Sequence, residues 1–229
     1  MTTCNVVKKL ALGVALSGLF AWQAGATIAY NFPGNLQGSQ PDGTYTLGNE
    51  FQVTTPITVT ALGAFDPNRA AFNSAVDVAI YSITLSGTSI SSISLATPVA
   101  IFSGSQSVFD GSTAIQAIAP VTLGVGTYMV VANNYGIAGA FQDYNQYWQQ
   151  PPGASQVSPN TIPGVTFTSV GYWNTGSGWN YDPVGNSTPR YGAGNFVVVP
   201  EAGGFALAGV ALLGLVYVGR CYRQKLQLA

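Results

Sequence analysis

Apolar and polar residues alternate along much of the chain between residues 27 and 199. In residues 57–61, threonines separate Ile57, Val59 and Ala61, and residues 76–80 keep the same period of two. This alternation is typical of β-strands with one buried face, because successive side chains point to opposite faces. Shorter segments of the same character, bounded by Gly, Pro, Asn, Asp and Ser, are 44–47, 50–53, 99–102, 114–118, 165–170 and 195–199.

Residues 126–132 differ, since apolar residues follow one another there almost without interruption. Such a run is expected where both faces of a strand are covered. No part of residues 27–199 keeps a period of 3.6 residues over several turns, as a helix would. We therefore predict an all-β fold, a single jelly-roll-like antiparallel β-sandwich, because two packed sheets bury many alternating strands.

Three stretches lack a clear alternation. Residues 143–163 are rich in Gln, Pro and Asn, and residues 173–190 are rich in Gly, Asn and aromatics, so both are predicted as irregular loops. The Ser-rich residues 82–97 predict either a long hairpin loop or a weak pair of edge strands. No internal repeat and no second domain emerges from the pattern.

The first 26 residues have the three-part pattern of a signal peptide. Lys8 and Lys9 precede an apolar stretch, residues 10–20, and small residues follow at Ala24 and Ala26. This order is that of a basic region, an apolar helix and a small-x-small cleavage site. We expect cleavage after Ala26 by signal peptidase, which leaves an exported domain over residues 27–199.

The other end of the chain predicts a transmembrane helix. Residues 202–219 carry no charge, and eighteen helical residues span about 27 Å, close to the hydrocarbon thickness of a bilayer. Arg220, Arg223 and Lys225 follow as a basic stop in the tail 220–229. Positive residues stay on the cytoplasmic side, so the bulk of the chain is expected outside.

Charge and composition narrow the function classes. Between residues 27 and 199 the basic residues are Arg69 and Arg190, against seven acidic residues, so the net charge there is 2 − 7 = −5. Nucleic acid is not an expected partner, because its binding needs a basic surface. Both cysteines, Cys4 and Cys221, lie in the targeting ends, and histidine is absent. We expect no metal and no other cofactor, since the usual zinc and copper ligands are missing. Calcium stays open as an alternative, because Asp and Asn in loops could supply its six to eight oxygen ligands, although no EF-hand or repeat motif is present.

The composition also argues against catalysis. Without histidine, a Ser-His-Asp triad or a Cys-His pair cannot form. Two carboxylates could hydrolyse a glycoside, and the candidates are Asp66, Asp77, Asp143 and Asp182. Asp66 and Asp182 have turn-forming neighbours, and Asp77 lies on the polar side of a predicted strand. We therefore expect a non-enzymatic protein.

The strongest binding signal is a concentration of aromatics in the two loop-like stretches, which hold all three tryptophans of residues 27–199. Flat rings stack on the apolar faces of sugars, and exposed aromatic patches mark binding sites. Alternatively, these aromatics close the ends of the sandwich and hold its loops in place. The candidate glycan-binding residues are Tyr144, Tyr147, Trp148, Trp173, Trp179 and Tyr181.

The C-terminal segment resembles the PEP-CTERM sorting signal of Gram-negative bacteria that make exopolysaccharide. That signal combines a Val-Pro-Glu-Pro motif, a hydrophobic helix and a short Arg-rich end. The matching residues are Val199, Pro200 and Glu201, the run 202–219, and Arg220 with Arg223. Ala202 stands where the family usually has its second proline. Two glycines ahead of the helix are similar to the related GlyGly-CTERM signal, but Val-Pro-Glu is the more specific match.

Residues 48–199 look like a secreted β-sandwich that recurs among PEP-CTERM proteins and has no assigned role. The similarity rests on the order of seven segments, 51–53, 56–66, 76–81, 97–100, 120–128, 164–167 and 191–196. The resemblance implies no catalytic residues.

The resemblance also implies a pathway of export and processing. The chain would cross the inner membrane, be held there by its C-terminal helix, be processed by an exosortase-type enzyme, and reach the cell surface or extracellular matrix. A structural or adhesive role in an exopolysaccharide or biofilm setting would follow. Two alternatives stay open: a carbohydrate-binding module that uses the loop aromatics, and a surface protein that keeps its membrane anchor.

Overall fold

The computed structural model describes residues 25–32, 45–66, 69, 71–87, 89–135, 157–174, 178–182 and 191–199. The predicted signal-peptide helix and the sorting signal fall outside these ranges, including Ala24, Pro200, Glu201, Ala202, Arg220, Arg223 and Lys225. Within the described ranges, no helix has the length and apolar character needed to cross a bilayer.

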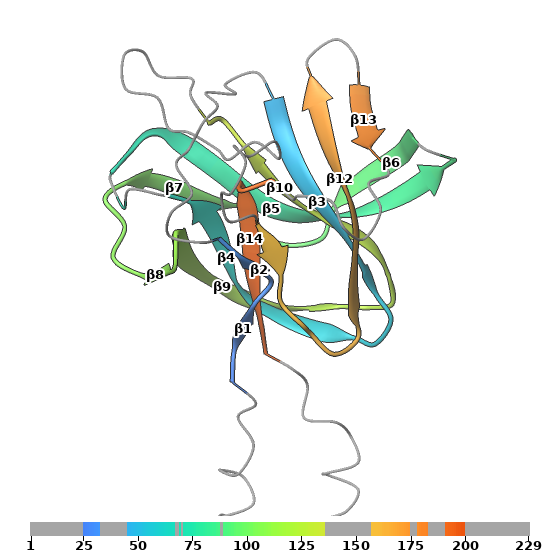
Figure 1. Cartoon of the computed structure of the whole chain (residues 1–229), viewed down its shortest axis with the longest axis horizontal. Coiled ribbons are helices and arrows are strands. Elements are labelled where there is room, and N and C mark those ends of the chain that lie inside the picture. Colours follow the sequence, from blue (N-terminus) through green and yellow to red (C-terminus); the bar gives the residue numbers. More distant parts are fainter. Residues whose placement is uncertain are drawn as a thin grey trace, which may run out of the picture. The chain divides into compact units, whose positions relative to one another are not determined.

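The strands of residues 26–199 form two large antiparallel sheets and a small one (Figure 1). The first large sheet has five strands, in the order β1 (Thr27–Ile28), β14 (Gly194–Val199), β4 (Ile57–Phe65), β9 (Thr113–Leu123) and β8 (Phe109–Asp110). The small sheet pairs β2 (Tyr30–Asn31) with β11 (Ser158–Pro159). The predicted all-β, antiparallel, sandwich-like fold is confirmed.

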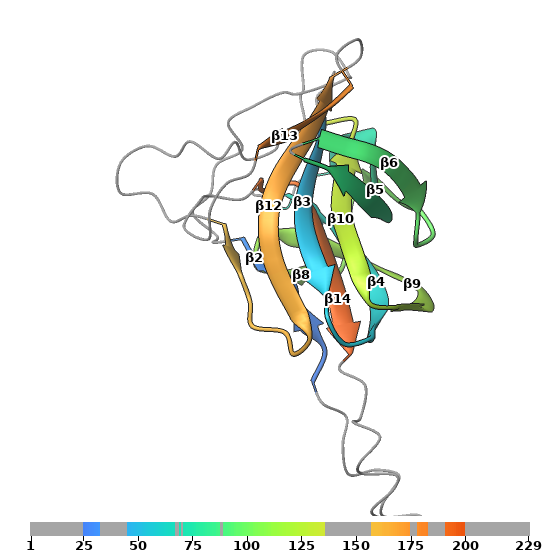
Figure 2. The same ribbon diagram turned by 90° about the vertical axis from the view of Figure 1, so that its right-hand side faces the viewer.

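The second large sheet has seven strands and is strongly curved. Its order is β13 (Gly178–Asp182), β12 (Val165–Asn174), β3 (Tyr45–Val53), β10 (Gly126–Asn133), β5 (Phe72–Ser86) and β6 (Ser89–Leu95), with β7 (Ala100–Gly104) also paired to β5. Although β13 and β6 stand at opposite ends of this order, they contact each other. The sheet therefore curls into a half-barrel, visible in Figure 2.

The main core lies between the two large sheets, and the alternating segments supply it. Val76, Val78 and Ile80 on β5 are fully buried there. On β4, Ile57 and Val59 are buried in the same way, as their spacing predicts. An aromatic group at the centre links the sheets, with Phe51 of β3 only 4.7 Å from Phe196 of β14 between ring centroids.

Strand β10 is covered on both faces, as its continuous apolar run predicts. Tyr128, Val130 and Ala132 belong to the main core. Met129 and Val131 point to the other face and are buried in a second apolar cluster with residues of β5 and β6. This second cluster lines the concave face of the half-barrel, so that face is not a simple solvated surface.

All three stretches that lack a clear alternation contain strands, and β11 is the strand within residues 143–163. The hairpin of β12 and β13 occupies much of residues 173–182, where a loop was expected. Cross-strand pairing with β3 extends β12 as far as Asn174, which the local Gly- and Asn-rich composition did not indicate. For residues 82–97, the second of the two predicted forms is confirmed, since β5 and β6 form an edge pair there.

The first and last strands of the sandwich are neighbours. In the ladder between β1 and β14, Thr27 lies opposite Val198. The β-structured unit thus begins next to the predicted cleavage site at Ala26 and ends at Val199, and the start of β1 and the end of β14 lie on the same side of it (Figure 1).

Candidate functional site

A groove of about 320 Å³ opens on the concave face of the seven-stranded sheet. This volume lies at the lower end of the range typical of ligand pockets, which is about 300–1,000 Å³. Five strands and the segment before β7 contribute to its wall. The lining residues are Thr46, Asp77, Val78, Ala79, Tyr81, Ile93, Val99, Val131, Asn133 and Trp173.

The register of the sheet brings the polar residues of the groove into one row. Trp173 on β12 pairs with Thr46 on β3, and Asn133 on β10 pairs with Asp77 on β5. The Thr46 hydroxyl donates to Oδ1 of Asn133 at 3.0 Å, which joins the two halves of the row. Because facing residues of an antiparallel pair share one side of the sheet, these four side chains line the same face.

Hydrogen bonds hold the polar groups and leave capacity for a ligand. Nδ2 of Asn134 donates to Oδ2 of Asp77 at 3.0 Å. Since Thr46 occupies Oδ1 of Asn133, the Asn133 amide nitrogen is turned away from that bond and has no partner among the described residues. The groove therefore offers a carboxylate acceptor next to an amide donor.

Apolar side chains make up the rest of the wall. Val131 and Ala79 are buried at its base, and Tyr81 and Ile93 are partly buried beside them. Trp173 is partly buried on the β12 side, and Val99 stands 44% exposed on the opposite rim. The combination of aromatic walls with a few placed polar groups is characteristic of small-molecule sites.

Partial burial raises the pKa of the Asp77 carboxyl, and the hydrogen bond from Asn134 offsets part of that rise by stabilising the charged form. A raised pKa in the folded state means that the charged carboxylate is less favourable in the groove than in the unfolded chain. Sites built for binding commonly tolerate such a cost, because they hold polar groups away from water.

Replacing Asp77 by asparagine is expected to raise the free energy of unfolding at pH 7. Asparagine fits the same space, still accepts from Asn134, and carries no charge to desolvate. For a carboxyl with a raised folded pKa, the stabilising contribution is present below the unfolded value of about 3.9 and is lost as the pH rises through the folded pKa. The advantage of Asp77→Asn in urea denaturation should therefore shrink as the pH falls toward 4. If Asp77→Asn raised the free energy of unfolding equally at pH 3 and pH 7, this expectation would be contradicted.

The predicted glycan-binding residues are only partly placed. Trp173 lines the groove, on a strand rather than in a loop. The register of the hairpin puts Trp179 opposite Trp173 and Tyr181 opposite Gly171. Tyr144, Tyr147 and Trp148 lie outside the described residues.

Sequence reasoning missed the remaining groove residues. Asp77 was placed correctly on the polar side of its strand, but Thr46, Tyr81 and Asn133 were not identified. One signal pointed to them. The uninterrupted apolar run in β10 indicates that its second face is covered, and cross-strand neighbours of Met129 and Val131 on that face then become candidates.

Glu50, another acidic residue of the described strands, is held by hydrogen bonds within the sheet. Glu50 on β3 is buried and accepts from Oγ1 of Thr168 at 2.6 Å and from Oγ of Ser169 at 2.9 Å. A β-bulge in β12 between Phe167 and Val170 brings these two hydroxyls to the same carboxylate. In the part of the chain that the structure describes, no three His, Cys, Asp or Glu residues are grouped so as to hold a metal.

No protein-family model, no curated protein and no solved structure matches this chain.

Proposed function

We propose that this chain is an exported, non-enzymatic protein, with a jelly-roll-like sandwich, that binds a saccharide of the cell surface or extracellular matrix through the concave groove. The observation that carries the proposal is the row of Trp173, Thr46, Asn133 and Asp77 above an apolar base. A PEP-CTERM-like signal would sort it, with signal peptidase and an exosortase-type enzyme as processing partners.

A sugar matches the two kinds of surface in this groove. Its ring presents C–H groups on one face, which pack against flat aromatic side chains such as Trp173 and Tyr81. Its hydroxyls both donate and accept, so they can pair with the Asp77 carboxylate and the Asn133 amide. A purely apolar ligand would leave those two polar groups desolvated without partners, which costs binding free energy.

The position of the groove supports a role at a surface. Trp173 is the penultimate residue of β12, Thr46 the second of β3 and Asn133 the last of β10. These strand ends lie at the pole of the sandwich opposite the start of β1 and the end of β14 (Figure 1). The groove therefore lies at the end of the sandwich opposite residues 27 and 199.

Replacing Trp173 by alanine is expected to weaken saccharide binding at least about tenfold, which corresponds to roughly 1.4 kcal/mol. The ring supplies one wall of the groove, and truncation removes its stacking surface. The measurement is a glycan array followed by calorimetry on the tightest neutral ligand.

Trp173→Phe serves as the matched control, since it keeps an aromatic face and should retain most of the affinity. Val125→Ala, at a turn residue that is 72% exposed, should change nothing. Equal binding by the wild type and Trp173→Ala would overturn the assignment of this groove as the site.

Export has its own test. Cell fractionation should find the protein outside the cytoplasm and without residues 202–219. Ala202→Pro restores the usual family motif and should be processed at least as completely. Full-length protein retained in the inner membrane would favour the permanently anchored alternative, and protein in the cytoplasm would overturn export.

A further inference from the structure

We infer that the groove binds neutral or amino sugars, which donate hydrogen bonds and carry no negative charge, in preference to uronic-acid chains. This inference rests on the proposed saccharide site. The inference comes from which charged groups the fold places in the groove and which it keeps elsewhere.

Asp77 sets the chemistry at the wall of the groove. One carboxylate oxygen is engaged by Nδ2 of Asn134, and a carboxylate can only accept further hydrogen bonds. A ligand that covers it must therefore supply donors. Neighbouring hydroxyls of a neutral sugar, or the ammonium of an amino sugar, meet this need. The carboxylate of a uronic acid brings a like charge and only acceptors to the same place.

A second acidic residue shares the concave face. Glu50 lies opposite Met129 across the ladder of β3 and β10, and Met129 lies opposite Tyr81 across the ladder of β10 and β5. Glu50 is buried and closed off by Thr168 and Ser169, so it is not a contact residue. Its place on the same face adds to the acidic character of the surroundings.

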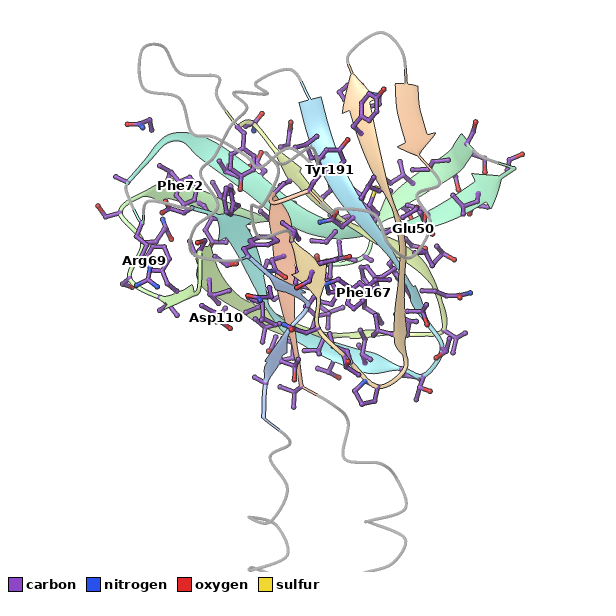
Figure 3. All side chains as sticks on the ribbon, viewed as in Figure 1. Glu50, Arg69, Phe72, Asp110, Phe167 and Tyr191 are labelled. Atoms are coloured by element: carbon purple, nitrogen blue, oxygen red, sulfur yellow. The ribbon has the colours of Figure 1, made fainter. Side chains whose placement is uncertain are left out.

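No cation among the described groove residues can compensate an acidic sugar. The exported domain has two basic residues, Arg69 and Arg190, and Arg190 lies outside the described residues. The Arg69 guanidinium donates to the Gly111 carbonyl at 3.1 Å and lies 5.3 Å from the centre of the Phe109 ring. Figure 3 shows Arg69 beside β8, far from the β6 and β13 end of the half-barrel. Binding of uronates normally uses such cations, because arginine pairs with carboxylates through two hydrogen bonds.

The test compares the affinity of one protein for three charge classes of ligand. Calorimetry is run on the full chain in a polyoxyethylene detergent, whose headgroup contains no sugar. The probes are hexamers of glucose, galactose and mannose, of glucosamine, and of a hexuronic acid. The test variant is Asp77→Asn. Asp110→Asn is the matched control, since it changes the net charge equally at an exposed residue of β8 (Figure 3).

We expect the wild type to bind a neutral or amino hexamer at least about tenfold more tightly than the hexuronate. Asp77→Asn should narrow this ratio to less than about threefold, and Asp110→Asn should keep the wild-type ratio. Tighter binding of glucosamine than of neutral hexamers, lost in Asp77→Asn, would identify the ammonium as the donor. Equal affinities for the glucosamine hexamer and the neutral hexamers would identify the sugar hydroxyls as the donors.

Two results would overturn the inference while leaving saccharide binding intact. One is wild-type affinity for the hexuronate equal to or above that for the neutral hexamers. The other is a ratio of neutral-hexamer to hexuronate affinity in Asp77→Asn that equals the wild-type ratio. Absence of binding to every hexamer would instead remove the proposed function, and the inference with it.

Discussion

Replacing Phe51 by alanine is expected to lower the free energy of unfolding by about 3–5 kcal/mol, the range for removing a buried phenylalanine. Phe51 is fully buried on β3. Its ring lies 5.7 Å from Tyr128 in a stacked arrangement and 4.7 Å from Phe196 on the opposite sheet. The residue thus joins neighbouring strands of one sheet to the other sheet, and a cavity at this point cannot close without moving both.

The measurement is urea denaturation of fragment 26–199, with tryptophan fluorescence as the probe of unfolding. Phe51→Leu keeps most of the volume and should lose substantially less than the alanine variant. Val125→Ala should lie within about 0.5 kcal/mol of the wild type, as surface substitutions usually do. A loss below about 1 kcal/mol in Phe51→Ala would show that the two sheets do not pack around this ring.

The strands of the sandwich could be predicted because each carries its own pattern. The period of two in residues 57–61 and 76–80 is a local property, and the structure buries the apolar members of both. The same is true of β10, where an unbroken apolar run indicates burial on two faces without naming what covers the second.

The groove could not be predicted in the same way, because it depends on the curl of a sheet. Asp77 has the sequence pattern of any residue on a solvated strand face. The curl of the sheet, in which β6 and β13 come into contact, turns that face inward, and the Asp77 carboxylate is partly buried there. The pairing that extends β12 to Trp173 is likewise non-local, since its partner Thr46 comes from the start of β3.

Buried asparagines are a further feature that composition alone conceals. Asn49 donates to the carbonyl of Tyr191 at 2.9 Å and accepts from its amide at 3.1 Å. A residue type associated with turns thus serves inside the core as a substitute for a strand partner. The two residues are 142 positions apart in the chain, so no local signal connects them.

Replacing Asn195 by alanine is expected to destabilise the domain by about 2–4 kcal/mol. Asn195 is fully buried on β14. Its side chain accepts from the Tyr30 amide at 3.0 Å and donates to the Tyr30 carbonyl at 2.7 Å. Truncation removes both of these bonds from a buried backbone, and each stranded polar group costs about 1–3 kcal/mol.

Hydrogen exchange provides the site-specific measurement for this variant, since the Tyr30 amide should exchange faster in Asn195→Ala beyond the effect of lowered global stability. Asn160→Ala is the matched control. Its side chain makes a single hydrogen bond, to the Ile28 carbonyl at 2.9 Å, and its loss should cost about 1 kcal/mol. Equal losses in the two variants would show that Asn195 does not hold the N-terminal segment.

Asn195→Ala also distinguishes an effect on the stability of the fold from an effect on saccharide binding. Tyr30 and β14 lie at the interface with the small sheet, and neither contributes to the groove. Below its unfolding transition, the variant should therefore bind saccharide as the wild type does, whereas Trp173→Ala should lose binding under conditions in which it remains folded. If the two substitutions instead weakened binding in parallel, the groove would depend on the global fold alone, and the row of residues from Trp173 to Asp77 would not be a binding site.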